Sequence, residues 1–234
     1  MERVESGIEG LDKMLDGGFL KGRPYIITGG PGAGKTVLCM QFLMAGAKKK
    51  EKGIYIALEE QAAELREDMA QFGWDLHNIK IVDTVQEISS GVWALKTDSV
   101  ISRPELNISN IAKMIENKIE NYSASRVVID SVTTIRMLAS NSSSVRSDIL
   151  SLINFLKKKD CTTLLTLETE DANRVLMEEF LVSGVIKLHN IQKDGEYVSA
   201  LSIEKFRGSS FDKHLRPFKI TSSGMKVFSD QTLI

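Results

Sequence analysis

Short apolar runs alternate with longer amphipathic stretches along most of the chain. Runs of this kind are typical of strands buried on both faces of a parallel sheet, and they occupy residues 23–28, 54–58, 79–83, 126–130 and 162–167. Apolar residues spaced three and four apart predict helices over residues 62–72, 108–119 and 145–156. Residues 36–44 are apolar on almost every side, which indicates a fully buried helix. This alternation predicts βαβ units and a central, mostly parallel twisted sheet flanked by helices.

The pattern changes toward both ends of the chain. Near the N-terminus one short amphipathic stripe predicts a small helix, made by Ile8, Leu11, Met14 and Leu15 and ended by Gly17 and Gly18. The triplet Lys193-Asp194-Gly195 is a hairpin signal, and the segments around it predict antiparallel strands added at one edge of the sheet. Residues 85–107 have no clear period and are interpreted as a surface loop.

These segments predict one domain that spans the whole chain. Its 234 residues are compatible with a single large α/β domain and supply enough apolar side chains for a buried core. We expect that domain over residues 1–234, with an entry segment (1–22), an α/β core (23–184) and C-terminal antiparallel strands (185–234).

Composition narrows the class of protein. The chain has 30 basic and 31 acidic residues, so its net charge of −1 creates no overall field that would attract nucleic acid or an anionic membrane. It shows no secretory leader and no apolar stretch of membrane-spanning length, so we expect a cytoplasmic protein with no membrane association. Cys39 and Cys161 both lie in apolar runs and are interpreted as core residues.

The chemistry of the chain centres on residues 29–36, Gly-Gly-Pro-Gly-Ala-Gly-Lys-Thr. This is the P-loop pattern G-x-x-x-x-G-K-[ST], in which backbone N–H groups wrap the phosphates of a nucleotide. The motif stands between a predicted strand and a predicted helix, as phosphate binding requires, and the helix adds its positive end to the anion site. We expect ATP phosphates to contact Gly30, Pro31, Gly32, Ala33, Gly34, Lys35, Thr36 and Val37, with Lys35 as the cation and the Thr36 hydroxyl as a Mg²⁺ ligand.

Acidic residues follow two of the predicted strands. Asp130 ends the strand over residues 126–130, at the edge that faces the nucleotide in a parallel sheet. A lone aspartate there is commonly a helix cap, but beside a P-loop it is better interpreted as a Mg²⁺ ligand opposite Thr36. Glu59 and Glu60 follow the strand over residues 54–58; either could orient the attacking water, or both could simply favour the start of the next helix.

Several motifs together resemble a single KaiC-type ATPase domain of the RecA superfamily. They are S-G-I-E-G-L-D-K-M-L-D-G-G (6–18), the P-loop, the strand followed by Glu59-Glu60, V-V-I-D-S-V (127–132), E-E-F-L-V-S-G-V-I-K-L (178–188) and the segment from Leu201 to Phe228. The resemblance covers essentially the whole chain and implies a RecA-like P-loop NTPase fold. It also implies an ATPase that assembles into a homo-oligomeric ring, usually a hexamer, with Mg²⁺ and ATP bound between subunits.

The resemblance assigns roles to further residues. It implies that Glu59 or Glu60 activates water and that Lys205 and Arg207 reach the γ-phosphate held by a neighbouring subunit. Barring a bulge, the two-residue period of a strand would place these cations on the same face as Leu201 and Ile203.

The sequence departs from the clock protein of this family in three ways that bear on function. That protein has two such domains in tandem, whereas this chain has one. Where it carries a phosphorylated Ser/Thr pair, this chain reads Glu168-Thr169-Glu170-Asp171, with no adjacent Ser/Thr pair, which argues against autokinase activity. The family's histidine shortly after the Arg-Gly turn is replaced here by Phe211, which affects part of the expected contact between subunits.

Three functions compete. The first is a ring-forming ATPase, which the set Lys35, Thr36, Asp130 and Glu59-Glu60 favours. The second is a nucleotide-gated assembly or scaffold module, in which ATP binding sets the oligomeric state and hydrolysis is negligible.

The third is a RadA/RecA paralog that couples ATP to single-stranded DNA through the loops after the third and fourth core strands. The near-neutral net charge and the mostly acidic second region disfavour this function. The two regions (133–148 and 168–179) carry only Arg136, Arg146 and Arg174 as arginines and show no basic-plus-aromatic platform. Under any of these functions, the sequence does not identify the protein partner.

Overall fold

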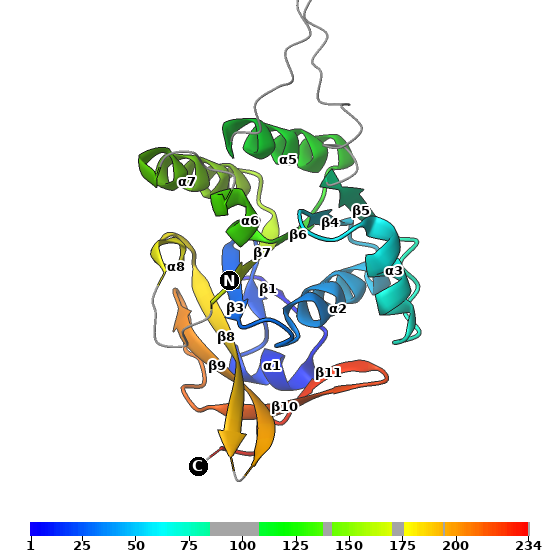
Figure 1. Ribbon diagram of the computed structural model, residues 1–234, viewed down its shortest axis with the longest axis vertical. Coiled ribbons are helices and arrows are strands. Elements are labelled where there is room, and N and C mark those ends of the chain that lie inside the picture. The colour runs from blue at the N-terminus through cyan, green and yellow to red at the C-terminus, as the bar shows by residue number, and fades with distance from the viewer. Residues whose placement is uncertain (85–107, 138–141, 170–175, 194, 234) are drawn as a thin grey trace, which may run out of the picture.

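A nine-stranded mixed sheet organises the protein (Figure 1). The computed structural model describes residues 1–84, 108–137, 142–169, 176–193 and 195–233. The strand order across the sheet is β11-β10-β9-β8-β3-β7-β6-β4-β5. The surface loop expected over residues 85–107 and the turn residue Asp194 lie outside the described residues.

The sheet has a parallel part and an antiparallel edge. The parallel strands are β3 (Pro24–Gly29), β4 (Gly53–Ala57), β5 (Ile79–Asp83), β6 (Arg126–Asp130), β7 (Thr162–Glu168) and β8 (Gly184–Lys193). Antiparallel pairing starts at β8 and continues through β9 (Glu196–Phe206), β10 (Arg216–Thr221) and β11 (Gly224–Val227). The predicted sheet, including its antiparallel C-terminal strands, is therefore confirmed.

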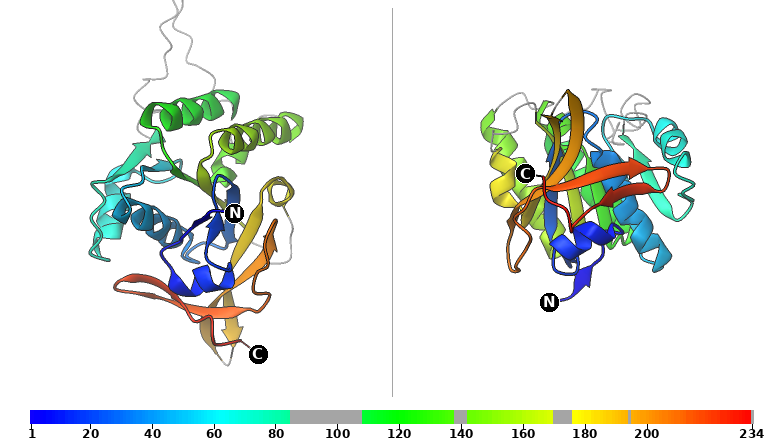
Figure 2. Two further views of the ribbon diagram at one scale, coloured as in Figure 1. Left: turned by 180° about the vertical axis from the view of Figure 1, so that it is seen from behind. Right: turned by 90° about the horizontal axis from the view of Figure 1, so that it is seen from below.

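Helices cover both faces of the sheet (Figure 2). A separate apolar core lies on each face. One core includes side chains of α1 (Glu9–Met14), α2 (Lys35–Lys48) and α3 (Ala62–Ala70). The other includes side chains of α5 (Ile108–Tyr122), α6 (Val132–Met137) and α7 (Ser142–Lys158), with α8 (Met177–Leu181) at its border. Two cores follow from a parallel sheet, because both of its faces are apolar.

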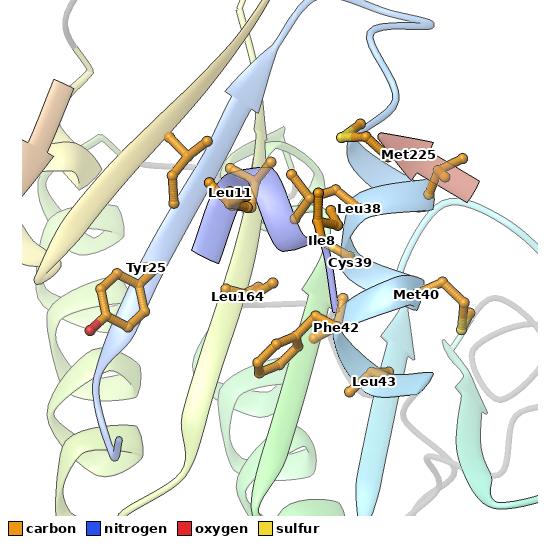
Figure 3. Close-up of a cluster of buried hydrophobic side chains, with 14 of the residues drawn as sticks. Ile8, Leu11, Tyr25, Leu38, Cys39, Met40, Phe42, Leu43, Leu164 and Met225 are labelled. Atoms are coloured by element: carbon orange, nitrogen blue, oxygen red, sulfur yellow. The ribbon is translucent and has the colours of Figure 1, made fainter. Parts of the chain in front are cut away.

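Helix α2 is the most completely buried helix of the first core (Figure 3). Leu38, Phe42 and Leu43 have no exposed surface, and the helix packs with Leu164 of β7 and Met225 of β11. This confirms the expectation of a helix that is apolar on almost every side. The predicted phosphate loop that precedes α2 is therefore joined to a helix that is packed on most of its sides.

Some short elements were not predicted from the sequence pattern. Strands β1 (Arg3–Val4) and β2 (Phe19–Leu20) pair in a separate two-stranded sheet and are too short to show a period. Helices α6 and α8, of six and five residues, are likewise too short to show a helical stripe. The region 133–148, weighed above for contact with DNA, holds most of α6 and the first residues of α7, whose helical stripe the sequence predicts from residue 145 onward.

A β-bulge interrupts the pairing of β8 and β9. Val185 pairs with Lys205, whereas the next residue of β8, Ile186, pairs with Ile203. Glu204 is therefore an additional residue on β9 without a partner position on β8. Because side chains alternate along a strand, one extra residue reverses which face the following side chains occupy.

The bulge corrects the expected position of the two C-terminal cations. Leu201 and Ile203 face the α2 core as expected, but beyond the bulge Phe206 takes that face and is 5% exposed. Lys205 points to the opposite face of the sheet, where it contacts α8. Arg207 lies just beyond the end of the strand and is exposed. The prediction that Lys205 and Arg207 share a face with Leu201 and Ile203 is wrong.

Among the described residues, no helix is both long and apolar enough to cross a membrane. The two cysteines are free and buried, Cys39 in α2 and Cys161 just before β7, as the sequence indicated.

Candidate nucleotide-binding site

A cavity of ≈ 350 Å³ opens at the carboxyl ends of the parallel strands. The loop before α2 and the start of that helix form one side of it, and residues at or just beyond the ends of β4, β6 and β7 form another. Its lining comprises Gly32, Ala33, Gly34, Lys35, Thr36, Val37, Tyr55, Ala57, Glu59, Glu60, Asp68, Met69, Gln71, Asp130, Glu168 and Ile220. The sheet therefore brings together the predicted P-loop, both predicted glutamates and the predicted aspartate.

The loop backbone has the shape that phosphate binding needs. Gly32 has φ +69°, and a Cβ on this residue would meet no atom within 4 Å, so the backbone there borders open space. Gly34 has φ +94°, and a Cβ there would lie 3.0 Å from Cδ1 of Ile220 and 3.1 Å from Cε of Met225. A positive φ favours glycine at both positions, and close packing from the C-terminal hairpin also does so at Gly34. The residues fit a phosphate cradle.

Lys35 lies inside this loop and not in the apolar core. Its ammonium group donates to the carbonyl oxygens of Gly29 (3.0 Å) and Gly30 (2.9 Å), and the side chain is 8% exposed. The carboxylate of Glu168, at the end of β7, is 3.6 Å away. The N-terminus of α2 begins at the same place, so the lysine and the helix end concentrate positive charge at one point.

Thr36 and Asp130 meet across the cavity, although they are 94 residues apart in sequence. The Thr36 hydroxyl donates to Oδ2 of Asp130 at 3.3 Å. A hydroxyl and a carboxylate are hard oxygen donors of the kind that Mg²⁺ prefers. The donor set therefore fits the expected Mg²⁺ site.

Two further hydroxyl groups contact the Asp130 carboxylate. The Tyr55 hydroxyl donates to Oδ2, and the Thr166 hydroxyl donates to Oδ1. Burial, followed by the charge of Asp130, raises the pKa of Tyr55 well above its ordinary value, so the phenol stays protonated. Sequence reasoning missed both residues, because each stands within an apolar strand with no local sign of a polar role.

Glu59 and Glu60 both reach the cavity but have different surroundings. Oε1 of Glu59 accepts hydrogen bonds from the hydroxyls of Ser131 and Thr134, at the start of α6. Burial, followed by the charges of Asp68, Asp130 and Glu64, raises the pKa of Glu60 above its ordinary value of 4.5. Glu59 is therefore held by hydroxyl donors, whereas the pKa of Glu60 is raised by burial and by nearby carboxylates.

Lys205 and Arg207 lie away from the cavity of their own subunit. The Lys205 ammonium group donates to the carbonyl oxygens of Glu179 (2.7 Å) and Phe180 (3.3 Å) in α8. Burial, followed by the charges of Arg207 and Lys157, lowers the pKa of Lys205. Lys205 is therefore engaged within its own subunit, and Arg207 is the more exposed of the two.

The regions weighed for DNA contact present little free positive charge. Nε of Arg136 lies 3.3 Å from Oε1 of Glu178, a carboxylate that is almost fully buried. Arg146 is exposed on α7, and Arg174 lies outside the described residues. A basic platform for nucleic acid is not visible in the described parts of these two regions.

Comparison with known proteins identifies the family. The family model described as "ATPase: KaiC" matches residues 4–232. The UPF0273 protein PH0284 of Pyrococcus horikoshii is 34% identical over 99% of this chain and 96% of its own length, and circadian clock protein KaiC3 of Synechocystis is 31% identical over 94% of this chain but 44% of its own. The solved structure of KaiC-like protein PH0186 from P. horikoshii has a TM-score of 0.82 and 33% identity, covering 97% of this chain and 99% of that one. The chain therefore belongs to the KaiC family of ATPases, as a single KaiC-type domain of the RecA superfamily.

Proposed function

We propose that the protein binds ATP with Mg²⁺ and hydrolyses it. One observation carries the proposal: a phosphate loop, a hydroxyl–carboxylate pair and two more carboxylates border the same cavity. Phosphate binding and metal binding account for Lys35, Thr36 and Asp130. They do not account for Glu59 and Glu60, because extra carboxylates repel phosphate unless one of them handles the attacking water.

The loop and Lys35 would bind the phosphates. Backbone N–H groups of the loop and the N-terminus of α2 offer donors to the phosphate oxygens. The Lys35 ammonium would exchange its contacts with Gly29 and Gly30 for the β/γ-phosphates. The Thr36 hydroxyl and the Asp130 carboxylate would hold Mg²⁺, which supplies positive charge that neutralises the phosphates during transfer.

Glu60 is our candidate for the group that accepts a proton from the attacking water. Burial and neighbouring carboxylates raise its pKa and hence its affinity for a proton, and a base acts best when its pKa approaches the working pH. We assign Glu59 to a supporting role, because its hydrogen bond from Ser131 ties the end of β4 to the residue that follows Asp130.

We propose that the active unit is a ring of subunits in which a neighbour completes each site. The family supports this assembly, and the position of Arg207, exposed beyond the end of β9 and away from its own cavity, leaves it available to a neighbouring subunit. An arginine supplied in this way neutralises charge on the transferring phosphoryl group. The contacts of Lys205 with α8 suggest that this lysine mainly positions the strand end that carries Arg207.

Steady-state phosphate release, combined with direct measurement of ATP binding, tests the proposal. We expect Mg²⁺-dependent release of phosphate, and we expect single-stranded DNA to leave the rate unchanged. Tight ATP binding without turnover would instead favour a nucleotide-gated scaffold. Strong stimulation by single-stranded DNA would favour a RadA/RecA-type role in repair.

A further inference from the structure

Three neighbouring strands contribute to the surroundings of Asp130. Asp130 ends β6, and β6 lies between β7 and β4 in the sheet. Thr166 of β7 donates to one carboxylate oxygen, and Tyr55 of β4 donates to the other, which also accepts the bond from Thr36. Both oxygens of the aspartate are thus contacted by hydroxyl groups whose own backbones are fixed in the sheet.

The register of the strands explains how a tyrosine reaches this aspartate. Asp130 pairs with Ala57, and Tyr55 precedes Ala57 by two residues on the same face of β4. Because Ala57 has a small side chain, it leaves room beside Asp130 for the far end of the Tyr55 ring. The ring is packed in the α2 core and is 1% exposed, so the position of its hydroxyl is determined by that packing.

We propose that Tyr55 is a positioning residue that, together with Thr166, orients the Asp130 carboxylate for Mg²⁺. The inference rests on the proposed function, because it concerns the same metal site. Partners that hold a metal-binding carboxylate fix its direction, and their loss commonly weakens metal affinity about tenfold to a hundredfold. A hydroxyl is suited to this role, since it donates to the carboxylate without adding a charge that would compete with the metal.

The test measures how ATP affinity depends on the concentration of Mg²⁺, by calorimetry with a slowly hydrolysed ATP analogue. In Tyr55→Phe we expect the Mg²⁺ concentration that gives half of the full affinity gain to rise by about tenfold or more. Affinity for the analogue in excess chelator should stay unchanged, because Tyr55 acts through Asp130 and not through the phosphates. A change that affected both conditions equally would indicate a structural role and would overturn the inference.

Tyr25→Phe is the matched control. Tyr25 is also fully buried in a core strand, and its hydroxyl bonds the backbone of Leu20, with distances of 2.9 Å from the amide nitrogen and 3.1 Å to the carbonyl oxygen. The control therefore loses a buried phenol hydroxyl far from the metal site. We expect it to lower stability but to keep the Mg²⁺ dependence of the unaltered protein.

Thr166 provides an independent variant in case Tyr55→Phe does not fold. Thr166→Val should also raise the Mg²⁺ concentration that is needed. Thr166→Ser should keep the Mg²⁺ dependence of the unaltered protein, because serine keeps the donating hydroxyl. Thr163→Val is its control, since the Thr163 hydroxyl bonds the carbonyl oxygen of Cys161 at 3.3 Å, at the other end of the strand. If the unaltered protein shows Mg²⁺-dependent binding but neither Tyr55→Phe nor Thr166→Val shifts it by more than twofold, the positioning role is wrong. If the unaltered protein shows no such binding, the proposed function fails with it.

Discussion

Gln41 of α2 forms hydrogen bonds with both backbone groups of Met225 in β11. Its Oε1 accepts from the Met225 N–H at 2.8 Å, and its Nε2 donates to the Met225 carbonyl at 3.3 Å and to the carbonyl of Gly7 at 2.9 Å. One side chain thus joins the nucleotide-loop helix to the entry segment and to the C-terminal hairpin. That hairpin in turn packs Ile220 and Met225 against Gly34.

Gln41→Ala should therefore loosen the hairpin. Removing one side chain leaves three backbone groups without their partner, which we expect to lower the free energy of unfolding by about 1–3 kcal/mol. Hydrogen exchange should accelerate in β11 more than in β6. Gln192→Ala, at an exposed position of β8, is the control and should change neither measurement. Equal stabilities of the two variants would contradict the role of Gln41.

Lys35→Ala should weaken ATP binding without unfolding the protein. The Lys35 ammonium contacts loop carbonyls and not core side chains, so its removal costs phosphate binding in particular. We expect at least a tenfold loss of ATP affinity by calorimetry, with an unchanged circular dichroism spectrum. Lys48→Ala, an exposed lysine at the far end of the same helix, should bind ATP normally. Undiminished affinity and turnover in Lys35→Ala would refute the phosphate assignment.

Glu60→Gln should separate binding from hydrolysis. Loss of the proton acceptor should slow turnover by a factor of about 10²–10⁴, which corresponds to an activation barrier that is ~3–5 kcal/mol higher, while ATP still binds. Glu59→Gln should slow it less, since that carboxylate is held by two hydroxyls. Glu67→Gln, exposed on α3, is the matched control. If neither Glu59→Gln nor Glu60→Gln slows turnover by even tenfold, the two glutamates only favour the start of the next helix.

The pH dependence of turnover provides a separate check on Glu60. A base acts when it is deprotonated, and the pKa of Glu60 is raised above 4.5 by burial and by neighbouring carboxylates. Activity should therefore fall as the pH decreases through this raised pKa, at a higher pH than an ordinary glutamate would give. In Glu60→Gln the residual rate should lose this acid limb. An acid limb that persists unchanged in the variant would assign the titration to another group.

Mixing variants tests whether subunits share a site. Arg207→Ala chains keep an intact P-loop, and Lys35→Ala chains keep an intact Arg207, so each should be inactive alone. Co-assembled mixtures should regain activity at interfaces where a subunit with an intact Lys35 contacts a neighbour with an intact Arg207. The control mixes Arg207→Ala chains with chains that carry both substitutions, which should remain inactive. If the mixture of Arg207→Ala and Lys35→Ala chains stays inactive despite proven co-assembly, the shared site is ruled out.

Local signals made most of the fold and the centre of the site predictable. A short stretch of sequence is enough to recognise the P-loop motif, the strand-terminal Asp130 and the adjacent glutamates. The structure brings all of them to one cavity. The face occupied by Lys205 depends on a bulge, which is set by pairing with β8 and leaves no mark in β9 itself. The contact of Tyr55 with Asp130 depends on strand order, which the sequence of either strand does not contain.

The packing of Ile220 and Met225 against Gly34 has a consequence for biosynthesis. The phosphate loop is made early in translation, but the hairpin that packs against it is made much later, since Gln41 and Met225 are separated by 184 residues. Chains begin to compact from the N-terminal side while synthesis continues. A nascent chain therefore carries its phosphate loop for most of translation without one wall of the cavity, and the pocket is completed only after residues 216–227 have emerged from the ribosome.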